Sequence, residues 1–180
     1  GLLRRASGAA VSLMAITHSG APATSNRAVV LGTLMLVYIS SYLDRQILAI
    51  LLPAIKAEFQ VSDTYLGLLS GLAFALFYTT LGLPLARIAD SKSRVNLLAA
   101  CIAAWSVMTA LCGLATSFIQ LVLARIGVGV GEAGCNPSAH SLIADYFPIE
   151  RRATALSIYA MGVPLGAMLG LVLGGWLGQE

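Results

Sequence analysis

Long runs of apolar residues alternate along the chain with short polar stretches. Each run is close to the roughly 20 residues that a membrane-spanning helix needs. The runs cover residues 28–54, 64–88, 95–117, 118–142 and 153–178. The polar stretch between the third and fourth runs is so short that these two helices must be antiparallel neighbours. The pattern therefore predicts an all-α membrane protein with five transmembrane helices.

The first 27 residues differ from the rest. Arg4 and Arg5, an apolar stretch at 9–16 and the small residues at 21–23 resemble a secretory signal peptide with a cleavage site. The favoured alternative is a disordered cytoplasmic tail over residues 1–27. The chain begins with Gly and ends at an expected membrane boundary, so we expect a fragment of a longer protein.

Composition supports a membrane protein and gives it an orientation. The chain is 58% hydrophobic and 11% charged, against roughly 25% charged residues in soluble domains. With a cytoplasmic N-terminus, eight basic residues outside the apolar cores lie on the cytoplasmic side and only Lys56 on the other, as the positive-inside rule requires. The net charge of +3 is too small and dispersed for a nucleic-acid partner. The short connections between the runs are typical of a protein of the bacterial inner membrane.

The three cysteines lie in apolar runs without the spacing of metal ligands. Cys101, Cys112 and Cys135 are interpreted as buried packing residues. We expect no disulfide, no metal site and no cofactor.

Four charged residues lie inside the apolar runs, at Asp44, Arg45, Arg125 and Glu132. Each charge costs roughly 2.5–3.5 kcal/mol at the centre of a membrane helix, so such residues usually mark an ion or substrate pathway. Two are acids and two are bases, so they can neutralise one another within a bundle. The pattern favours a transporter.

The fourth run carries two of these charges among closely spaced glycines. Gly129, Gly131 and Gly134 match the dinucleotide-binding fingerprint, but that fingerprint needs a strand before it and a turn facing solvent. Within a membrane helix the glycines fit close helix packing better. Arg125 and Glu132 are seven residues apart, so they share a face about 10 Å apart along the axis.

The first run presents the complementary charges on a polar stripe with Ser40 and Ser41. Contact between Asp44 and Arg125 is therefore possible. Two interpretations stay open: a static ion pair that fixes helix register, or a coupling or substrate site. Burial favours a neutral carboxyl group and a nearby arginine favours a charged one, so an acid here can carry a proton. The sequence does not choose between Asp44 and Glu132.

Two further sets of residues are candidates for packing or for a cavity. The fifth run has a glycine at every fourth position, which predicts a close-packing surface: Gly162, Gly166, Gly170, Gly174 and Gly178. Aromatic and polar residues on the first, second and fourth runs are candidates for a substrate cavity, with packing as the favoured role: Tyr38, Ser41, Phe77, Tyr78 and Asn136.

The connections reveal a family resemblance. Segment 86–94 resembles the loop motif of the major facilitator superfamily through Asp90 and Arg94, although Ala86 and Ser93 replace its glycines. Segment 121–131 resembles the helix-four motif of that superfamily, with Arg125 as the matching arginine. Within the superfamily, segments 42–45, 125–134 and 137–148 resemble the spinster-like branch.

This resemblance implies a bundle of twelve helices in two pseudo-symmetric halves. Residues 28–180 would then be helices one to five of the N-terminal six-helix bundle, and the C-terminal half of the same protein would be the missing partner. The resemblance also implies alternating access and proton coupling through Asp44 and Glu132. Members of the branch are linked to amphipathic lipids.

The sequence thus predicts a secondary active transporter in the lipid bilayer that moves a small-molecule or lipid-like substrate, coupled to protons through Asp44, Arg45, Arg125 and Glu132. The alternative is a non-transporting membrane scaffold or sensor, which would explain the glycines but not the four charges. A channel would usually show rings of charge or carbonyls. An enzyme would need a metal cluster or a nucleophile–base pair that the sequence lacks, so none is expected.

Overall fold

The computed structural model describes residues 24–91 and 93–177, and the regular elements in these ranges are helices. Five helical segments there are long and apolar enough to cross a membrane: Asn26–Phe59, Asp63–Leu85, Arg94–Gly113, Phe118–Tyr146 and Ile149–Trp176. The prediction of an all-α membrane protein with five such helices is confirmed. Of the tail expected at 1–27, residues 1–23 lie outside the described residues, and 24–27 begin the first helix.

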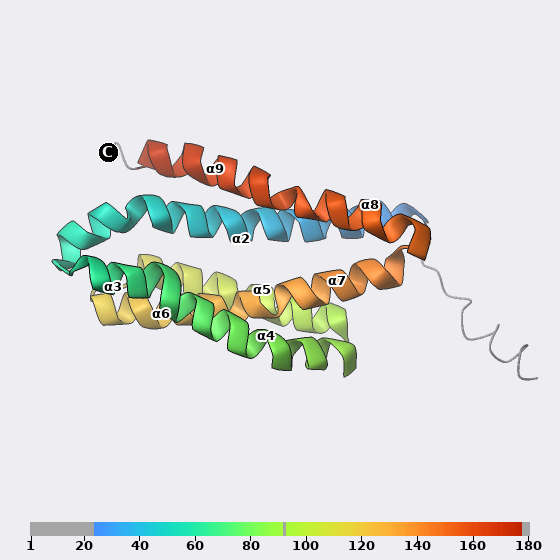
Figure 1. Ribbon diagram of the computed structural model, residues 1–180, viewed down its shortest axis with the longest axis horizontal. Coiled ribbons are helices and arrows are strands. Elements are labelled where there is room, and N and C mark those ends of the chain that lie inside the picture. Colours follow the sequence, from blue (N-terminus) through green and yellow to red (C-terminus); the bar gives the residue numbers. More distant parts are fainter. Residues whose placement is uncertain (1–23, 92, 178–180) are drawn as a thin grey trace, which may run out of the picture.

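The first span is α2 (Thr24–Phe59), which lies between two groups of helices (Figure 1). On one side run α8 (Ile149–Ala160) and α9 (Gly162–Leu177), which together form the fifth span. On the other side lie the remaining helices: α3 (Asp63–Gly67), the π-helical turn η1 (Leu68–Leu72), α4 (Ala73–Ser91), α5 (Arg94–Gly113), α6 (Phe118–Ala133) and α7 (Cys135–Tyr146). Residues from both groups therefore meet on α2.

Prolines divide the fourth and fifth spans. A proline has no N–H to bond the carbonyl four residues before it. The helix α6 ends at Ala133, four residues before Pro137, and α8 ends at Ala160, four residues before Pro164. Each span is consequently two helices in series rather than one continuous rod.

Glycines allow α9 to approach α2 closely. A Cβ atom at Gly162 would lie 3.1 Å from Cβ of Tyr38, and one at Gly170 would lie 2.6 Å from Cβ of Gln46. At Gly166 an added Cβ would collide with the backbone oxygen of Ile39. The predicted glycine stripe thus packs on the first span at Gly162, Gly166, Gly170 and Gly174; Gly178 lies outside the described residues.

The glycines of α6 have the same role against two other helices. A Cβ at Gly131 would lie 2.7 Å from the backbone nitrogen of Trp105 on α5. A Cβ at Gly129 would lie 3.2 Å from the ring of Phe74 on α4. Since Trp105 and Phe74 are both buried, α6 lies tightly between α4 and α5.

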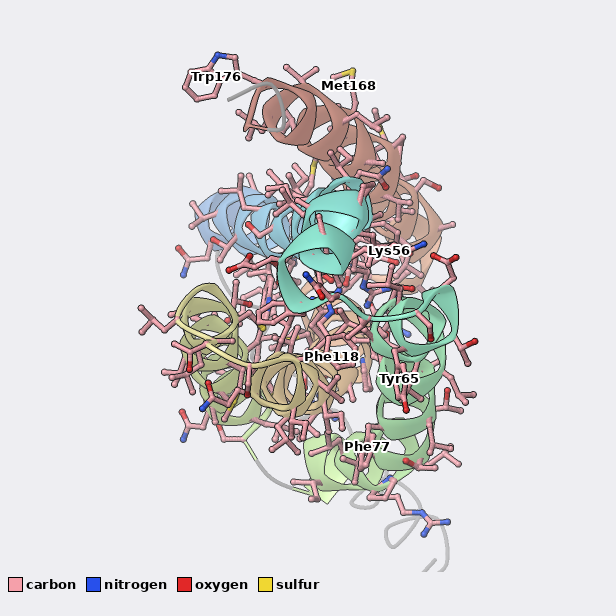
Figure 2. All side chains as sticks on the ribbon, turned by 90° about the vertical axis from the view of Figure 1, so that its left-hand side faces the viewer. Lys56, Tyr65, Phe77, Phe118, Met168 and Trp176 are labelled. Atoms are coloured by element: carbon pink, nitrogen blue, oxygen red, sulfur yellow. The ribbon has the colours of Figure 1, made fainter. Side chains whose placement is uncertain are left out.

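The face of α9 that points away from α2 is apolar and exposed. Met168 and Trp176 extend outward from the bundle in Figure 2, with 54% and 64% of their surface exposed. Apolar side chains that face outward on a membrane-length helix are expected to contact lipid tails. The polar groups described next are enclosed on the opposite side of α2.

Candidate functional site: paired charges between the first and fourth spans

Arg45 on α2 bonds Glu132 on α6. Its Nε and Nη2 atoms donate to Oε2 of Glu132 at 3.0 and 2.5 Å. The Glu132 side chain is 2% exposed, while that of Arg45 is 29% exposed. Two nitrogens of one guanidinium donate to the same carboxylate oxygen, which is a charge-assisted contact, so this pair ties the first span to the fourth.

Asp44, the residue before Arg45, faces a different set of partners. Its Oδ2 atom lies 3.7 Å from Nη1 of Arg125 on α6. The same oxygen accepts hydrogen bonds from Nε1 of Trp105 and Oγ1 of Thr109 on α5, each at 3.0 Å. The carboxylate is therefore held by donors from two other spans.

The four predicted charges thus form two pairs that cross between the same two helices. Each helix supplies one acid and one base, so the cluster is neutral as a whole. Consecutive residues of a helix point about 100° apart, which explains why Asp44 and its neighbour Arg45 reach different partners. In one pair α2 supplies the base, and in the other it supplies the acid. Together the two pairs restrict rotation and sliding of α2 against α6.

A single aromatic ring lies close to both arginines. The Phe74 ring centroid lies 4.7 Å from the Arg45 guanidinium carbon and 5.0 Å from that of Arg125. Tyr42 and Tyr78 rings also lie near Arg45, at 5.2 and 5.3 Å. Ring faces attract cations, so Phe74 stabilises both guanidinium groups.

A hydrogen-bonded chain extends from this cluster toward α7 and α8. The Tyr159 hydroxyl donates to Oδ1 of Asn136 at 2.6 Å, and Nδ2 of Asn136 donates to the Tyr78 hydroxyl at 2.9 Å. Tyr159 also stacks on Tyr38, with ring centroids 4.4 Å apart. Asn136 therefore joins α4 to α8 next to the paired charges.

Two cavities border the charges. One of about 350 Å³ is lined by Asp44 and Arg125 and extends along α2 as far as Glu58 and Phe59. The other, of about 400 Å³, is lined by Arg45, Arg125 and Tyr78. Of the residues expected in a cavity, Tyr78 lines the second; Tyr38, Ser41, Phe77 and Asn136 line none of the cavities described here.

At the end of the bundle where α4 is followed by α5, Arg94 of the predicted loop motif bonds Asp145 at the end of α7. The side chain of Asp90 lies outside the described residues. Arg152 on α8 donates to the carbonyls of Ala144 and Phe147 at 2.7 and 3.0 Å, where it caps α7. These contacts connect the third, fourth and fifth spans at one membrane boundary.

Sequence reasoning missed the partners from α4 and α5. Trp105 and Thr109 are four positions apart, so they lie on one face of α5, and both carry donors within an otherwise apolar helix. That spacing was an available signal. A phenylalanine in an apolar helix is ordinary, so Phe74 gave no signal of its contact with the two arginines.

A bundle of membrane-length helices that encloses balanced charges at mid-depth defines an integral, multi-pass membrane protein. The family model of the major facilitator superfamily matches residues 34–180. The chain belongs to this superfamily, and the solved structure of a spinster homologue and the spinster relatives place it in the spinster-like branch.

A solved structure and curated relatives support this family assignment. A bacterial homologue of the human lysosomal transporter spinster, solved in an inward-facing and unoccupied conformation, has a TM-score of 0.83 and 44% identity, covering 87% of this chain and 33% of that one. An MFS-type efflux pump of Mycolicibacterium smegmatis is 37% identical, over 83% of this chain and 35% of the relative. The sphingosine-1-phosphate transporter SPNS2 of Danio rerio is 31% identical, over 79% of this chain and 29% of the relative.

The chain thus spans about a third of the length of the relatives it matches. These relatives are transporters rather than enzymes, which confirms the expectation that this protein is not an enzyme.

Proposed function

We propose that this chain is helices one to five of a secondary active transporter, which moves a small or amphipathic organic solute by alternating access. In that scheme two helical halves rock about a site near the membrane midplane. The relatives named as an efflux pump and as a sphingosine-1-phosphate transporter support transport of this kind.

The observation that carries the proposal is the crossed pairing of four charges between α2 and α6. A purely static pair is expected to satisfy its donors, because an unpaired buried group is costly. Arg125 is 5% exposed, yet its Nε atom has no partner among the described residues, and its Nη1 atom lies 3.7 Å from Asp44. A buried arginine with a spare donor and a loose partner can exchange contacts as the bundle moves.

Proton coupling would act through the two acids. Protonation removes the negative charge that holds the partnered arginine, so it weakens Asp44–Arg125 or Arg45–Glu132. Loss of either contact frees α2 to shift against α6 and changes which side of the cavity is open. Asp44, whose side chain is 20% exposed, is within reach of water; Glu132, at 2%, is enclosed.

The proposed setting is a bacterial inner membrane with the N-terminus in the cytoplasm, as the distribution of basic residues favours. The partners are then the lipid bilayer, the transported solute, protons and the second half of the same protein. Arg94 and Asp145 would lie at the cytoplasmic boundary, where their contact stabilises one orientation of the spans.

The test uses the full-length protein in proteoliposomes with an imposed pH gradient. The probes are sphingosine-1-phosphate and the fluorescent cation ethidium. We expect flux of at least one probe, driven by the gradient, and loss of its pH dependence in Asp44→Asn with folding intact. Gradient-driven flux that is unchanged in Asp44→Asn would exclude the role of Asp44. Absence of flux for both probes would favour a scaffold or sensor.

A further inference from the structure

The described contacts of Asp44 all converge on one of its two oxygens. Oδ2 accepts from Nε1 of Trp105 and Oγ1 of Thr109, both at 3.0 Å, and lies 3.7 Å from Nη1 of Arg125. Both of the hydrogen bonds that Asp44 accepts from side chains of the described residues go to Oδ2, and neither goes to Oδ1. The two oxygens of this carboxylate therefore have different surroundings.

We propose that Trp105 and Thr109 are positioning residues that hold Oδ2 of Asp44 and leave Oδ1 to take up the proton. The inference rests on the proposed proton-coupled function and adds to it a third span, α5. A carboxylate oxygen with two neutral donors and a nearby arginine is a poor proton acceptor, because a proton there would displace a donor. The proton therefore goes to the other oxygen.

Asp44 borders two open spaces, and its side chain is 20% exposed. Asp44 borders the cavity of about 350 Å³ that extends toward Glu58. It also borders a groove of about 590 Å³ between α2 and α5, whose lining includes the hydroxyl residues Ser40 and Ser106. Thr109 lines both spaces, so the bond from Thr109 to Asp44 lies between them.

Helix packing keeps the two donors in place. Trp105 is 7% exposed, and its backbone lies against Gly131 of α6, where even a methyl group would collide. Thr109 is one helical turn further along the same face of α5. A shift of α5 against α6 would therefore move both donors relative to Asp44.

Other charged and titratable groups lie around Asp44. Arg45 and Glu132 form their own pair, Arg125 lies between Glu132 and Asp44, and Cys112 on α5 is near Asp44. Glu58 shares its cavity at the exposed end. None of these groups donates a hydrogen bond to Asp44 in the part of the chain that the structure describes, so the two donors from α5 can be removed without altering a charge.

The experiment measures how transport by the full-length protein in proteoliposomes depends on pH, with the probe that shows flux in the preceding test. Thr109→Val removes one donor at nearly constant volume, and Trp105→Phe removes the other donor while keeping a smaller aromatic ring. Because each donor favours the charged carboxylate, each variant should move the pH of half-maximal transport upward by up to roughly one unit. Thr109→Ser keeps the hydroxyl and should restore the original profile.

Matched controls separate this inference from the proposed function. Ser106→Ala removes a hydroxyl from the same groove and should leave the profile unchanged. In an Asp44→Asn background, Thr109→Val should have no effect on the profile. If Asp44→Asn abolishes pH dependence while Trp105→Phe and Thr109→Val leave the profile in place, the role of α5 is refuted and the proposed function stands. If Asp44→Asn leaves pH dependence intact, the proposed coupling itself fails.

Discussion

The guanidinium of Arg45 bonds one carboxylate oxygen of Glu132, although the residues are 87 positions apart in the chain. Removing one partner leaves the other charge poorly solvated. We expect Glu132→Gln to lower the free energy of unfolding by about 1–3 kcal/mol. This is less than the cost of breaking a fully buried pair, because the Arg45 side chain is partly exposed. A double-mutant cycle with Arg45→Met, followed by thermal unfolding in detergent, should show a coupling of about 1 kcal/mol or more.

The pair between Lys56 and Asp63 is the control for this cycle. Its atoms are 2.6 Å apart, but its side chains are 46% and 83% exposed. Exposed pairs contribute about 0–1 kcal/mol, so Lys56→Met with Asp63→Asn should show almost no coupling. Equal coupling in the two cycles would contradict the view that burial strengthens the Arg45–Glu132 contact.

Replacing the ring that lies close to both arginines tests its effect on both. Phe74→Leu keeps an apolar side chain but removes the aromatic face from Arg45 and Arg125, so we expect a loss of about 1–3 kcal/mol of stability together with impaired transport. Phe77→Leu, on the same helix and without such a contact, should cost less than about 1.5 kcal/mol. Thermal midpoints and probe flux of the two variants, side by side, decide the question.

The contact of α9 with α2 predicts that alanine substitutions have very different effects at a glycine that faces α2 and at one that does not. At Gly166 a methyl group meets the backbone of Ile39, which cannot move aside cheaply, whereas Gly175 has open space around it. Gly166→Ala should lower the thermal midpoint of the full-length protein by several degrees, as overpacking costs about 1–3 kcal/mol. Gly175→Ala should leave it nearly unchanged; a similar drop in both would contradict the packing role.

The bridge at Asn136 predicts a moderate loss in Tyr159→Phe. The hydroxyl of Tyr159 donates a hydrogen bond to Oδ1 of Asn136, and Tyr159 is 3% exposed. Its removal leaves Oδ1 of Asn136 without this donor and should cost about 1 kcal/mol. Tyr65→Phe is the control, because Tyr65 is 56% exposed; equal thermal midpoints for both variants would argue against the bridge.

The sequence was sufficient to predict the membrane spans and the four charges at their centre, because the cost of burying charge makes such residues stand out from apolar neighbours. It also predicted that the glycines of the fifth span form a packing surface. Periodicity alone determines which face carries a residue, so these features needed no knowledge of the partner helix.

The sequence indicated that Asp44 and Arg125 could meet, but it did not assign Arg45 to Glu132. Which base meets which acid depends on the rotation of α2 against α6, and one step along a helix changes direction by about 100°. The roles of Phe74, Trp105 and Thr109 depend on a third and a fourth helix, whose placement follows from the close approach at Gly129 and Gly131. Such contacts are set by tertiary packing rather than by a local pattern.

The proline breaks in the fourth and fifth spans have a mechanical consequence. At each break one helical hydrogen bond is absent, so bending there works against fewer bonds than elsewhere along the span. The segments beyond the breaks, α7 and α8, are joined by only the two residues 147–148. Bending of these two spans is therefore expected near Ala133 and Ala160, while the segment that holds Arg125 and Glu132 stays straight.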